Sequence, residues 1–322
     1  MKKISRLIAS GLVLMFALSA SSYGWSDTGH MAVAFVAYQK LNPQTRARVD
    51  ALVRLNPSFD DWSQTLIPAG TPAARKRMML FMIAATWPDQ IKGDSRYHPD
   101  GPDGGNRPPN DGTADRNIGY SDLARHKYWH FTDKPFSPDN TTLEDPPVPN
   151  AETQIAAFRA VLASTSPDEL KSYDLMWLLH LVGDVHQPLH CAARFTRFDL
   201  DGGGDDGGNE VMVRNSVGAE PKTLHSFWDG LLGTSSDPRA AITAGQGLPP
   251  ANAGLANNLD AGVWIDESFA AAKSTVYKPP IGVRAGPFTI TSAYRTTARA
   301  LAKKRVALGG ARLANILNNE LR

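Results

Sequence analysis

Residues 174–190 read DLMWLLHLVGDVHQPLH, an apolar stretch that carries His180, Asp184 and His190. The hydrophobic residues predict a core helix, on which His180 and Asp184, four residues apart, would share one face. Pro188 cannot continue a helix, so we expect His190 to leave the helix axis and face a second position. Buried imidazole and carboxylate groups need partners, which favours a metal site over a plain core helix.

The other periodic segments predict a mainly α fold, a single-domain multi-helix bundle with few short strands. Ser166, Pro167 and Glu169 are expected to form a capping box at the start of the central helix. Asn150 should cap a helix of about 14 residues. The remaining expected helices are 43–55, 261–275, 292–321 and one that starts at Pro72, contains the apolar run 78–85 and ends at Trp87-Pro88-Asp89.

Three segments rich in Gly, Pro, Asp and Asn predict irregular structure. Residues 94–118 and 134–149 are expected to be long loops, and His98 in the first is expected to be solvated. Residues 199–209, DLDGGGDDGGN, have the spacing of neither a phosphate-binding loop nor an EF-hand. A short strand is expected at 210–214.

The N-terminus predicts export. Basic residues 2, 3 and 6 precede an apolar run at 7–20, and Ser22 and Gly24 form a small-x-small cleavage site before Trp25. Residues 1–24 are therefore expected to be a removed signal peptide and 25–322 a single domain, located in the periplasm or secreted; a retained anchor is the alternative. Cleavage changes the formal charge from +2 to −1, which predicts no broad basic face for nucleic acid.

Side chains that match His180, Asp184 and His190 are spread along the chain. His225 and Asp229 repeat the spacing of four residues, and Asp89 follows a helical segment. Cys191 is the one cysteine, expected to be a small buried residue, with a soft metal ligand as the alternative. The candidate ligands are the Trp25 α-amine, His30, Asp89, His130, His180, Asp184, His190, His225 and Asp229. Imidazole and carboxylate groups without thiolate are typical of catalytic zinc, and nine ligands suit three ions if one carboxylate bridges.

These motifs together resemble the trinuclear-zinc, single-strand-specific nucleases of fungi, plants and bacteria. The resemblance rests on Trp25-x4-His30, Trp-Pro-Asp at 87–89, Tyr-Trp-His-Phe at 128–131, His180-x3-Asp184 with Gln-Pro-Leu-His at 187–190, and His225-x3-Asp229. It implies three zinc ions (Zn²⁺) per chain. One would be held by Asp89, His130, His180 and Asp184, the second by Trp25, His30 and the bridging Asp184, and the third by His190, His225 and Asp229.

The resemblance also implies an activity. Single-stranded DNA and RNA would be hydrolysed to 5′-phosphorylated products by a hydroxide shared between two zinc ions, with Asp89 and Asp184 as catalytic residues; 3′-nucleotidase activity is a further implication. Phe131 would stack on a base and Asp133 would bind its edge. Phe131 as a core aromatic is the alternative, and Lys92, which could neutralise phosphate, is expected rather to be a solvated surface charge.

Two other functions remain open from the residues. A zinc-dependent phospholipase C has a similar metal cluster, but its last ligand pair ends in glutamate, whereas Asp229 is an aspartate. A secreted metal-binding protein without catalysis would saturate the coordination of its ions, whereas a catalytic site keeps an open position.

For the nuclease, the expected partner is a single-stranded nucleic acid or nucleotide substrate. No membrane association after cleavage and no obligate protein partner are expected. Fungal and plant relatives have disulfides, which one cysteine cannot form.

Overall fold

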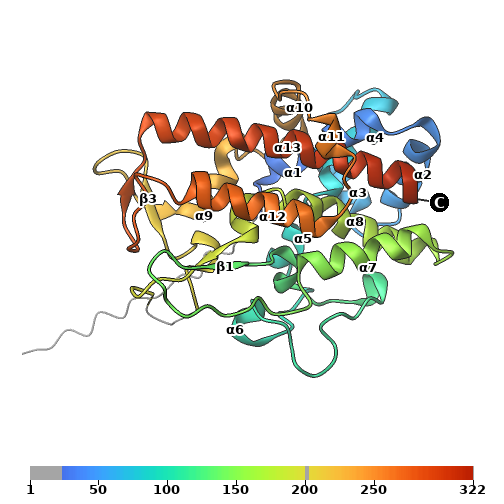
Figure 1. Cartoon of the computed structure of the whole chain (residues 1–322). Coiled ribbons are helices and arrows are strands. Elements are labelled where there is room, and N and C mark those ends of the chain that lie inside the picture. The colour runs from blue at the N-terminus through green and yellow to red at the C-terminus, as the bar shows by residue number, and fades with distance from the viewer. Residues whose placement is uncertain (1–23, 200–202, 322) are drawn as a thin grey trace, which may run out of the picture.

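The structure is a computed structural model that describes residues 24–199 and 203–321. It is mainly helical with a few two- or three-residue strands, as predicted (Figure 1). The predicted signal peptide, apart from Gly24, lies outside the described residues. The α-helices are α1 (Asp27–Lys40), α2 (Pro43–Val53), α3 (Phe59–Asp61), α4 (Ala73–Ala84), α5 (Trp87–Gly93), α6 (Pro102–Gly105), α7 (Ala151–Ala163), α8 (Asp168–Asp184), α9 (Leu224–Asp229), α10 (Pro238–Gln246), α11 (Ala253–Ala256), α12 (Ala261–Ala271) and α13 (Ser292–Glu320).

Helix α8 lies at the centre of the fold. Every residue from Lys171 to Asp184 is buried, as expected for a helix enclosed on all sides. Helices α7, α2, α13, α1 and α5 all pack against it. Trp177 anchors an aromatic cluster, with its ring centroid 4.9 Å from that of Trp129 and 6.2 Å from that of Trp87. The stretch that carries His180 and Asp184 is therefore held rigidly from several directions.

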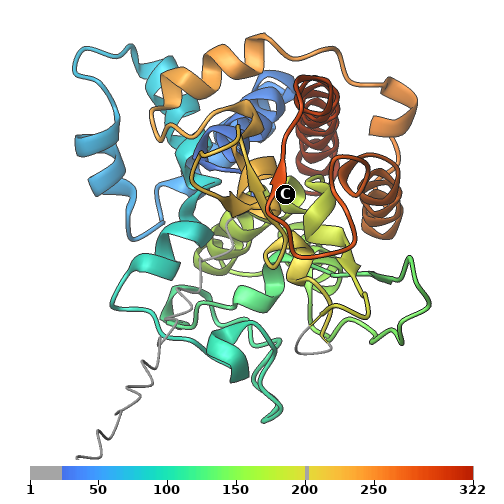
Figure 2. The ribbon, with the colours of Figure 1, turned by 90° about the vertical axis from the view of Figure 1, so that its left-hand side faces the viewer.

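Helix α1 is enclosed by α13, α10 and α4. Figures 1 and 2 show α13, in red, running alongside α1, in blue. The two backbones approach closely at Gly310, where a Cβ atom would lie 2.5 Å from the Cβ of Val36. Glycine is therefore required at this crossing, and the contact fixes the position of His30 on α1. Within the described residues, no helix has both the length and the apolar character needed to cross a bilayer.

The short strands hold loops against the core through backbone pairing. Strand β1 (Pro135–Phe136) pairs in parallel with β2 (Ala193–Arg194). In a second sheet, β3 (Met212–Arg214) lies between β4 (Lys222–Thr223) and β5 (Phe288–Thr289), antiparallel to the first and parallel to the second. The strand expected at 210–214 is thus confirmed in its last three residues.

The long loop at 94–118 is folded against the core, with α6 as its one short helix among the described elements. The carbonyl of Ala114 accepts a hydrogen bond from Trp129 Nε1 at 3.0 Å. Asn117 Nδ2 donates to Asp174 Oδ2 at 3.0 Å, which ties the loop to α8. His98 is exposed, as expected.

Several helix boundaries differ from the predictions, and α2 ends at Val53 rather than at Leu55. Helix α8 begins at Asp168, and Pro167, not Ser166, stands at its N-cap without a side-chain hydrogen bond, so the predicted capping box is wrong. Helix α4 ends at Ala84, and a new helix, α5, begins at Trp87. Pro88 sits in the first turn of α5, where proline is tolerated because its missing N–H would have no helical partner. The expected helix at 261–275 changes to a π-helical turn after Ala271.

Candidate metal centre

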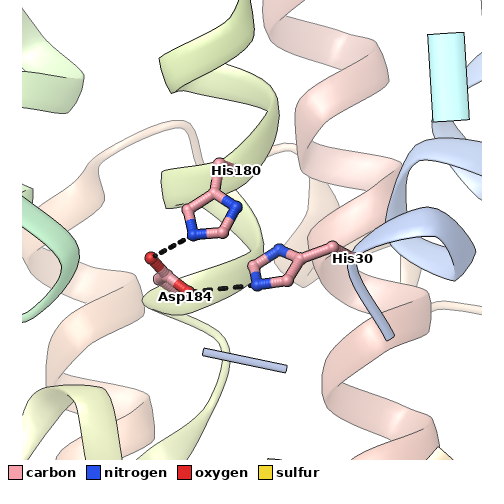
Figure 3. A group of neighbouring side chains, drawn as sticks. All are labelled: His30, His180 and Asp184. Atoms are coloured by element: carbon pink, nitrogen blue, oxygen red, sulfur yellow. Dashed lines mark ion pairs between the residues drawn. The ribbon is translucent and has the colours of Figure 1, made fainter. Parts of the chain in front are cut away.

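Asp184 lies between two imidazoles that come from different helices. His180, one turn earlier on α8, places Nε2 at 3.2 Å from Asp184 Oδ2. His30 on α1 places Nε2 at 3.4 Å from Asp184 Oδ1 and stacks on the His180 ring at 3.8 Å (Figure 3). All three side chains are fully buried. Because each carboxylate oxygen faces a different imidazole, Asp184 is placed to serve two neighbouring cations.

Asp89 and His130 complete one side of this group. His130 is the last residue of a short 3-10 turn, Lys127–His130, and places Nδ1 at 3.1 Å from Asp184 Oδ2. Asp89, in the first turn of α5, places Oδ1 at 3.7 Å from His180 Nε2. The ligand atoms of Asp89, His130 and His180 lie within 4.8 Å of one another, as do those of His30, His180 and Asp184. The two groups share His180, and Asp184, a member of the second group, also faces His130 of the first.

A separate group is formed by His190, His225 and Asp229, whose ligand atoms also lie within 4.8 Å of one another. The Nε2 atoms of His190 and His225 are 3.1 Å apart, and Asp229 Oδ2 is 3.7 Å from His225 Nε2. Pro188 opens a 3-10 turn that carries His190 away from the axis of α8, as predicted. His190 Nδ1 still lies 3.7 Å from Asp184 Oδ1, so the groups are neighbours.

Backbone carbonyls orient three of these imidazoles. His180 Nδ1 lies 2.8 Å from the carbonyl of Ala85, His190 Nδ1 lies 2.6 Å from that of His130, and His225 Nδ1 lies 2.8 Å from that of Gly207. A carbonyl only accepts, so each Nδ1 carries the proton and each Nε2 presents a lone pair to the centre. This arrangement is typical of metal-binding histidines.

The buried donors and acceptors of the centre fit a cation. His30 Nε2, His130 Nε2 and Asp184 Oδ1 are buried and have no hydrogen-bond partner among the residues that the structure describes. Leaving such groups unpaired costs roughly 1–3 kcal/mol each, and a cation with nitrogen and oxygen ligands would remove that cost. The thiol of Cys191 instead donates to the carbonyl of Val185 at 3.4 Å. Cys191 is a buried structural residue, as expected.

The pKa values at the centre follow burial and the surrounding charges. Burial alone would raise the pKa of Asp184, but His180 and His190 hold it well below its usual range. Burial, and then the charge of Lys92, lowers the pKa of His130 to about 3, which leaves its imidazole neutral at pH 7. Burial, with repulsion from Asp89 and Asp184, raises the pKa of Asp229. A divalent cation would offset that repulsion.

The backbone before Trp25 reaches the same centre. A Cβ placed on Gly24 would lie 1.8 Å from Asp184 Oδ1 and 2.8 Å from His30 Nε2. The Trp25 indole is fully buried, which anchors this end of the domain. The peptide nitrogen of Trp25 therefore begins a chain segment that lies against two of the candidate ligands.

The three expected substrate-binding residues border the centre. Lys92 is buried and its Nζ lies 2.7 Å from Asp89 Oδ1, so the expectation of a solvated surface charge is wrong. Phe131 is half-buried and packs partly against the core. Burial, and then the carboxylates of Asp206 and Asp205, raises the pKa of Asp133.

Gly207 shows how Asp133 is placed. Its backbone has a positive φ of 57°, and a Cβ on Gly207 would lie 3.6 Å from Asp133 Oδ1 and 3.4 Å from His225 Nδ1. The glycine-rich loop therefore closes between the predicted base-binding residue and the third ligand group. Glycine is favoured here because other residues rarely adopt this conformation.

The residues of this centre lie within a segment that matches a known protein family. The S1/P1 Nuclease family model matches residues 25–322. The chain belongs to the S1/P1 nuclease family. This confirms the resemblance, and with it the mainly α fold.

Several plant proteins are similar to this family member. Endonuclease 1 of Arabidopsis thaliana is 29% identical over 169 residues, which cover 45% of this chain and 48% of that protein. Endonuclease 2 of the same plant is 26% identical over 188 residues, 52% of this chain and 58% of that protein. Endonuclease 4 is 35% identical over 74 residues, 22% of this chain and 21% of that protein. The chain spans about half the length of the first of these relatives.

The centre of this S1/P1 nuclease also contains residues for which no role is predicted from the sequence. Gln187 Nε2 donates to Asp229 Oδ1 at 2.8 Å and so holds that carboxylate in place. A cleft of about 460 Å³ opens beside Asp89 and Asp229 and is also lined by Ser26, Asp27 and Gln90. Gln187 is the first residue of the Gln-Pro-Leu-His motif, which is the sequence signal that singles it out. Asp27 and Gln90 come together only through the tertiary fold.

Proposed function

We propose that the protein is a zinc-dependent endonuclease that hydrolyses single-stranded DNA and RNA to 5′-phosphorylated products. The observation that carries the proposal is Asp184, whose Oδ2 lies 3.1 Å from His130 Nδ1 and whose Oδ1 lies 3.4 Å from His30 Nε2, two imidazoles of different ligand groups. Such a bridging carboxylate suits two adjacent cations, and His190, His225 and Asp229 would hold a third. Membership of the S1/P1 nuclease family supports the same conclusion.

Each ligand group has a role in this proposal. Bound zinc would lower the pKa of a water molecule and offset the charge of a phosphate. The residues of the chain supply its placement: carbonyls fix the histidine tautomers, and Lys92 holds Asp89 through a bond of 2.7 Å. The cleft beside Asp89 and Asp229 gives a phosphodiester access to the ligand groups.

Base recognition is assigned to the residues that follow His130. Phe131, half-buried beside the ligand group, would stack on an unpaired base, which is worth roughly 1–3 kcal/mol per base and tolerates any sequence. Asp133 would accept hydrogen bonds from the edge of that base. Stacking needs an unstacked base, so the proposal favours single strands over duplex.

The N-terminus also belongs to the proposal. Removal of residues 1–24 would give Trp25 a free α-amine beside Asp184 and His30, where it would be a further zinc ligand. We infer accordingly that the protein is exported and processed. Sequencing the N-terminus of protein recovered from the periplasm or the medium should begin at Trp25; a retained leader in active protein contradicts this.

The deciding experiment combines metal content with hydrolysis. Elemental analysis of the mature protein should give about three zinc ions per chain. The same preparation should release 5′-mononucleotides from single-stranded DNA and RNA, and a chelator should stop the release. Parallel assays with a 3′-nucleotide and with phosphatidylcholine test 3′-nucleotidase and phospholipase C activity.

The outcomes separate the candidate functions. Full zinc content with cleavage of phosphatidylcholine and not of nucleic acid would replace the nuclease with a phospholipase. Full zinc content with no hydrolysis of any of these substrates would favour a metal-binding protein. Fewer than two zinc ions per chain would refute the assembled centre.

A further inference from the structure

Positive charge is concentrated in one part of the chain. Residues 40–77 contain seven lysines and arginines against three aspartates, a net charge of +4. Residues 78–322 have a net charge of −4. The near-neutral total of the chain without residues 1–24 therefore conceals a basic region built from α2, α3 and α4, the blue helices at the right of Figure 1.

Two adjoining hollows lie in this region, with volumes of about 260 and 520 Å³. Asp50, Arg54 and Arg77 line both hollows, so they form one continuous depression, which we call the basic groove. Its four cationic side chains are Arg46 and Arg54 from the α2 side and Lys76 and Arg77 from α4.

The groove has an excess of positive charge that its own acidic group does not offset. Asp50 is the one carboxylate among the residues that line it, and it accepts from Tyr38 Oη at 3.0 Å and pairs with Arg77 Nε at 3.1 Å. Within the described residues, neither Arg54 nor Lys76 has a carboxylate within 4 Å. Four cations facing one carboxylate in a concave surface attract an anion of several charges.

The groove also contains an aromatic side chain. Phe59 on α3 is half-buried and lines the smaller hollow beside Lys76. Proteins that bind single-stranded nucleic acid without sequence preference combine a basic groove with aromatic rings on which bases stack. This pairing favours a nucleic acid over a small anion.

A hydrogen bond connects the chain segment beside the groove to the cleft at the metal centre. Trp62 Nε1 donates to Gln90 Oε1 at 3.0 Å. Trp62 lies between the groove residues Phe59 and Ser63 in the sequence, and Gln90 lines the cleft beside Asp89. The segment that contributes Phe59 and Ser63 to the groove is therefore tied to a residue that lines the cleft.

We propose that the basic groove binds the phosphodiester backbone of single-stranded nucleic acid beyond the nucleotide that reacts at the metal centre. The proposal rests on the proposed nuclease function and extends it: long strands would bind more tightly than dinucleotides, whereas the chemical step would be the same for both. Arg54 and Lys76 are positioning residues for the strand and do not touch the reacting phosphate.

The test compares two double variants of the zinc-loaded protein. Arg54→Gln/Lys76→Gln removes two charges from the groove. The control, Arg75→Gln/Lys304→Gln, removes two charges from exposed positions, one of them next to Lys76 on α4, that do not line the groove. Cleavage of a single-stranded 24-mer and of a dinucleotide is measured between 50 and 200 mM salt.

The groove variant should have a higher KM and a weaker salt dependence with the 24-mer only. Each phosphate contact on a single strand contributes roughly 0.7 to the logarithmic salt slope, so over this fourfold range the wild-type KM should rise about sevenfold more than that of the variant. Dinucleotide cleavage should be unchanged in both variants, which also shows that they fold. Equal 24-mer kinetics in the groove and control variants would overturn the proposal.

Binding separates failure of the groove from failure of the proposed function. Fluorescence anisotropy with a labelled phosphorothioate 24-mer measures the groove even if the wild type hydrolyses nothing. Weaker binding by the groove variant alone supports the groove. Equal binding by all three proteins overturns it, and so does a groove variant that loses only inhibition by inorganic phosphate, since the site would then hold a small anion.

Discussion

Replacing Asp174 with asparagine should make the protein more stable at neutral pH, because its carboxyl group is buried without enough hydrogen bonds. Asp174 is fully buried in α8, and among the described residues only Asn117 Nδ2 donates a hydrogen bond to it, at 3.0 Å from Oδ2. Oδ1 has no hydrogen-bond partner in the same part of the chain. Burial raises the pKa of Asp174 from 3.8 to about 8, so the folded protein keeps this group protonated at pH 7.

The sign of the pH dependence follows from the raised pKa. Between about pH 4 and pH 8 the folded state binds a proton that the unfolded state has released, so stability falls as pH rises through this window. Each pH unit corresponds to roughly 1.4 kcal/mol, which gives a cost on the order of 4 kcal/mol at pH 7. Asparagine has nearly the same shape and does not ionise, so Asp174→Asn should recover most of this free energy.

The assay is urea unfolding of wild-type and Asp174→Asn protein with excess zinc, at several values from pH 5 to pH 8. Because both proteins contain the same metal-ligand groups, the difference between their unfolding free energies measures the contribution of the Asp174 carboxyl group. The difference should be small near pH 5 and grow towards pH 8. Asn117→Ala, which removes the donor and keeps the carboxyl group, should be less stable than wild type. A difference independent of pH, or a less stable Asp174→Asn at pH 8, would refute the argument.

Three further outcomes are expected at the metal centre. Extending the N-terminus before Trp25 should sharply reduce activity, because an amide replaces the amine; equal rates for tagged and untagged protein would count against the amine ligand. Asp184→Asn should lose more activity than Asp229→Asn at matched zinc content, since Asp184 faces two ligand groups; the reverse order would argue against bridging. Gln187→Leu frees Asp229 Oδ1 and should weaken binding of one zinc ion roughly 10–100-fold by competition with a chelator; three equally tight sites would show that Gln187 has no such role.

The grouping of the candidate ligands was largely predictable, because several of them are spaced by one helical turn along the chain. His180 and Asp184 are one helical turn apart, as are His225 and Asp229, and Pro188 marks the point where His190 leaves the helix. The structure brings all of the predicted histidine and aspartate ligands together. Such patterns depend on the helix period and on the position of proline, and both can be recognised in the sequence.

Features that depend on contacts between distant segments were not predictable in the same way. Lys92 looked like a surface charge, and only the packing around α5 buries it beside Asp89. The Trp-Pro-Asp sequence predicts a helix end, but proline is also accepted in a first turn, and Pro88 stands in the first turn of α5. The basic groove was hidden because a net charge averages the whole chain and says nothing of where the arginines lie.

The close contact between α1 and α13 has a consequence for the order of events during synthesis. His30 belongs to the first helix described, whereas Gly310, which packs on Val36 of that helix, belongs to the last. A growing chain thus produces His30, Asp89 and Asp184 well before the helix that holds α1 in place. The ligand groups can reach their final geometry only when α13 has emerged, so a chain interrupted before Ser292 would expose the buried face of α1 and remain a target for proteases.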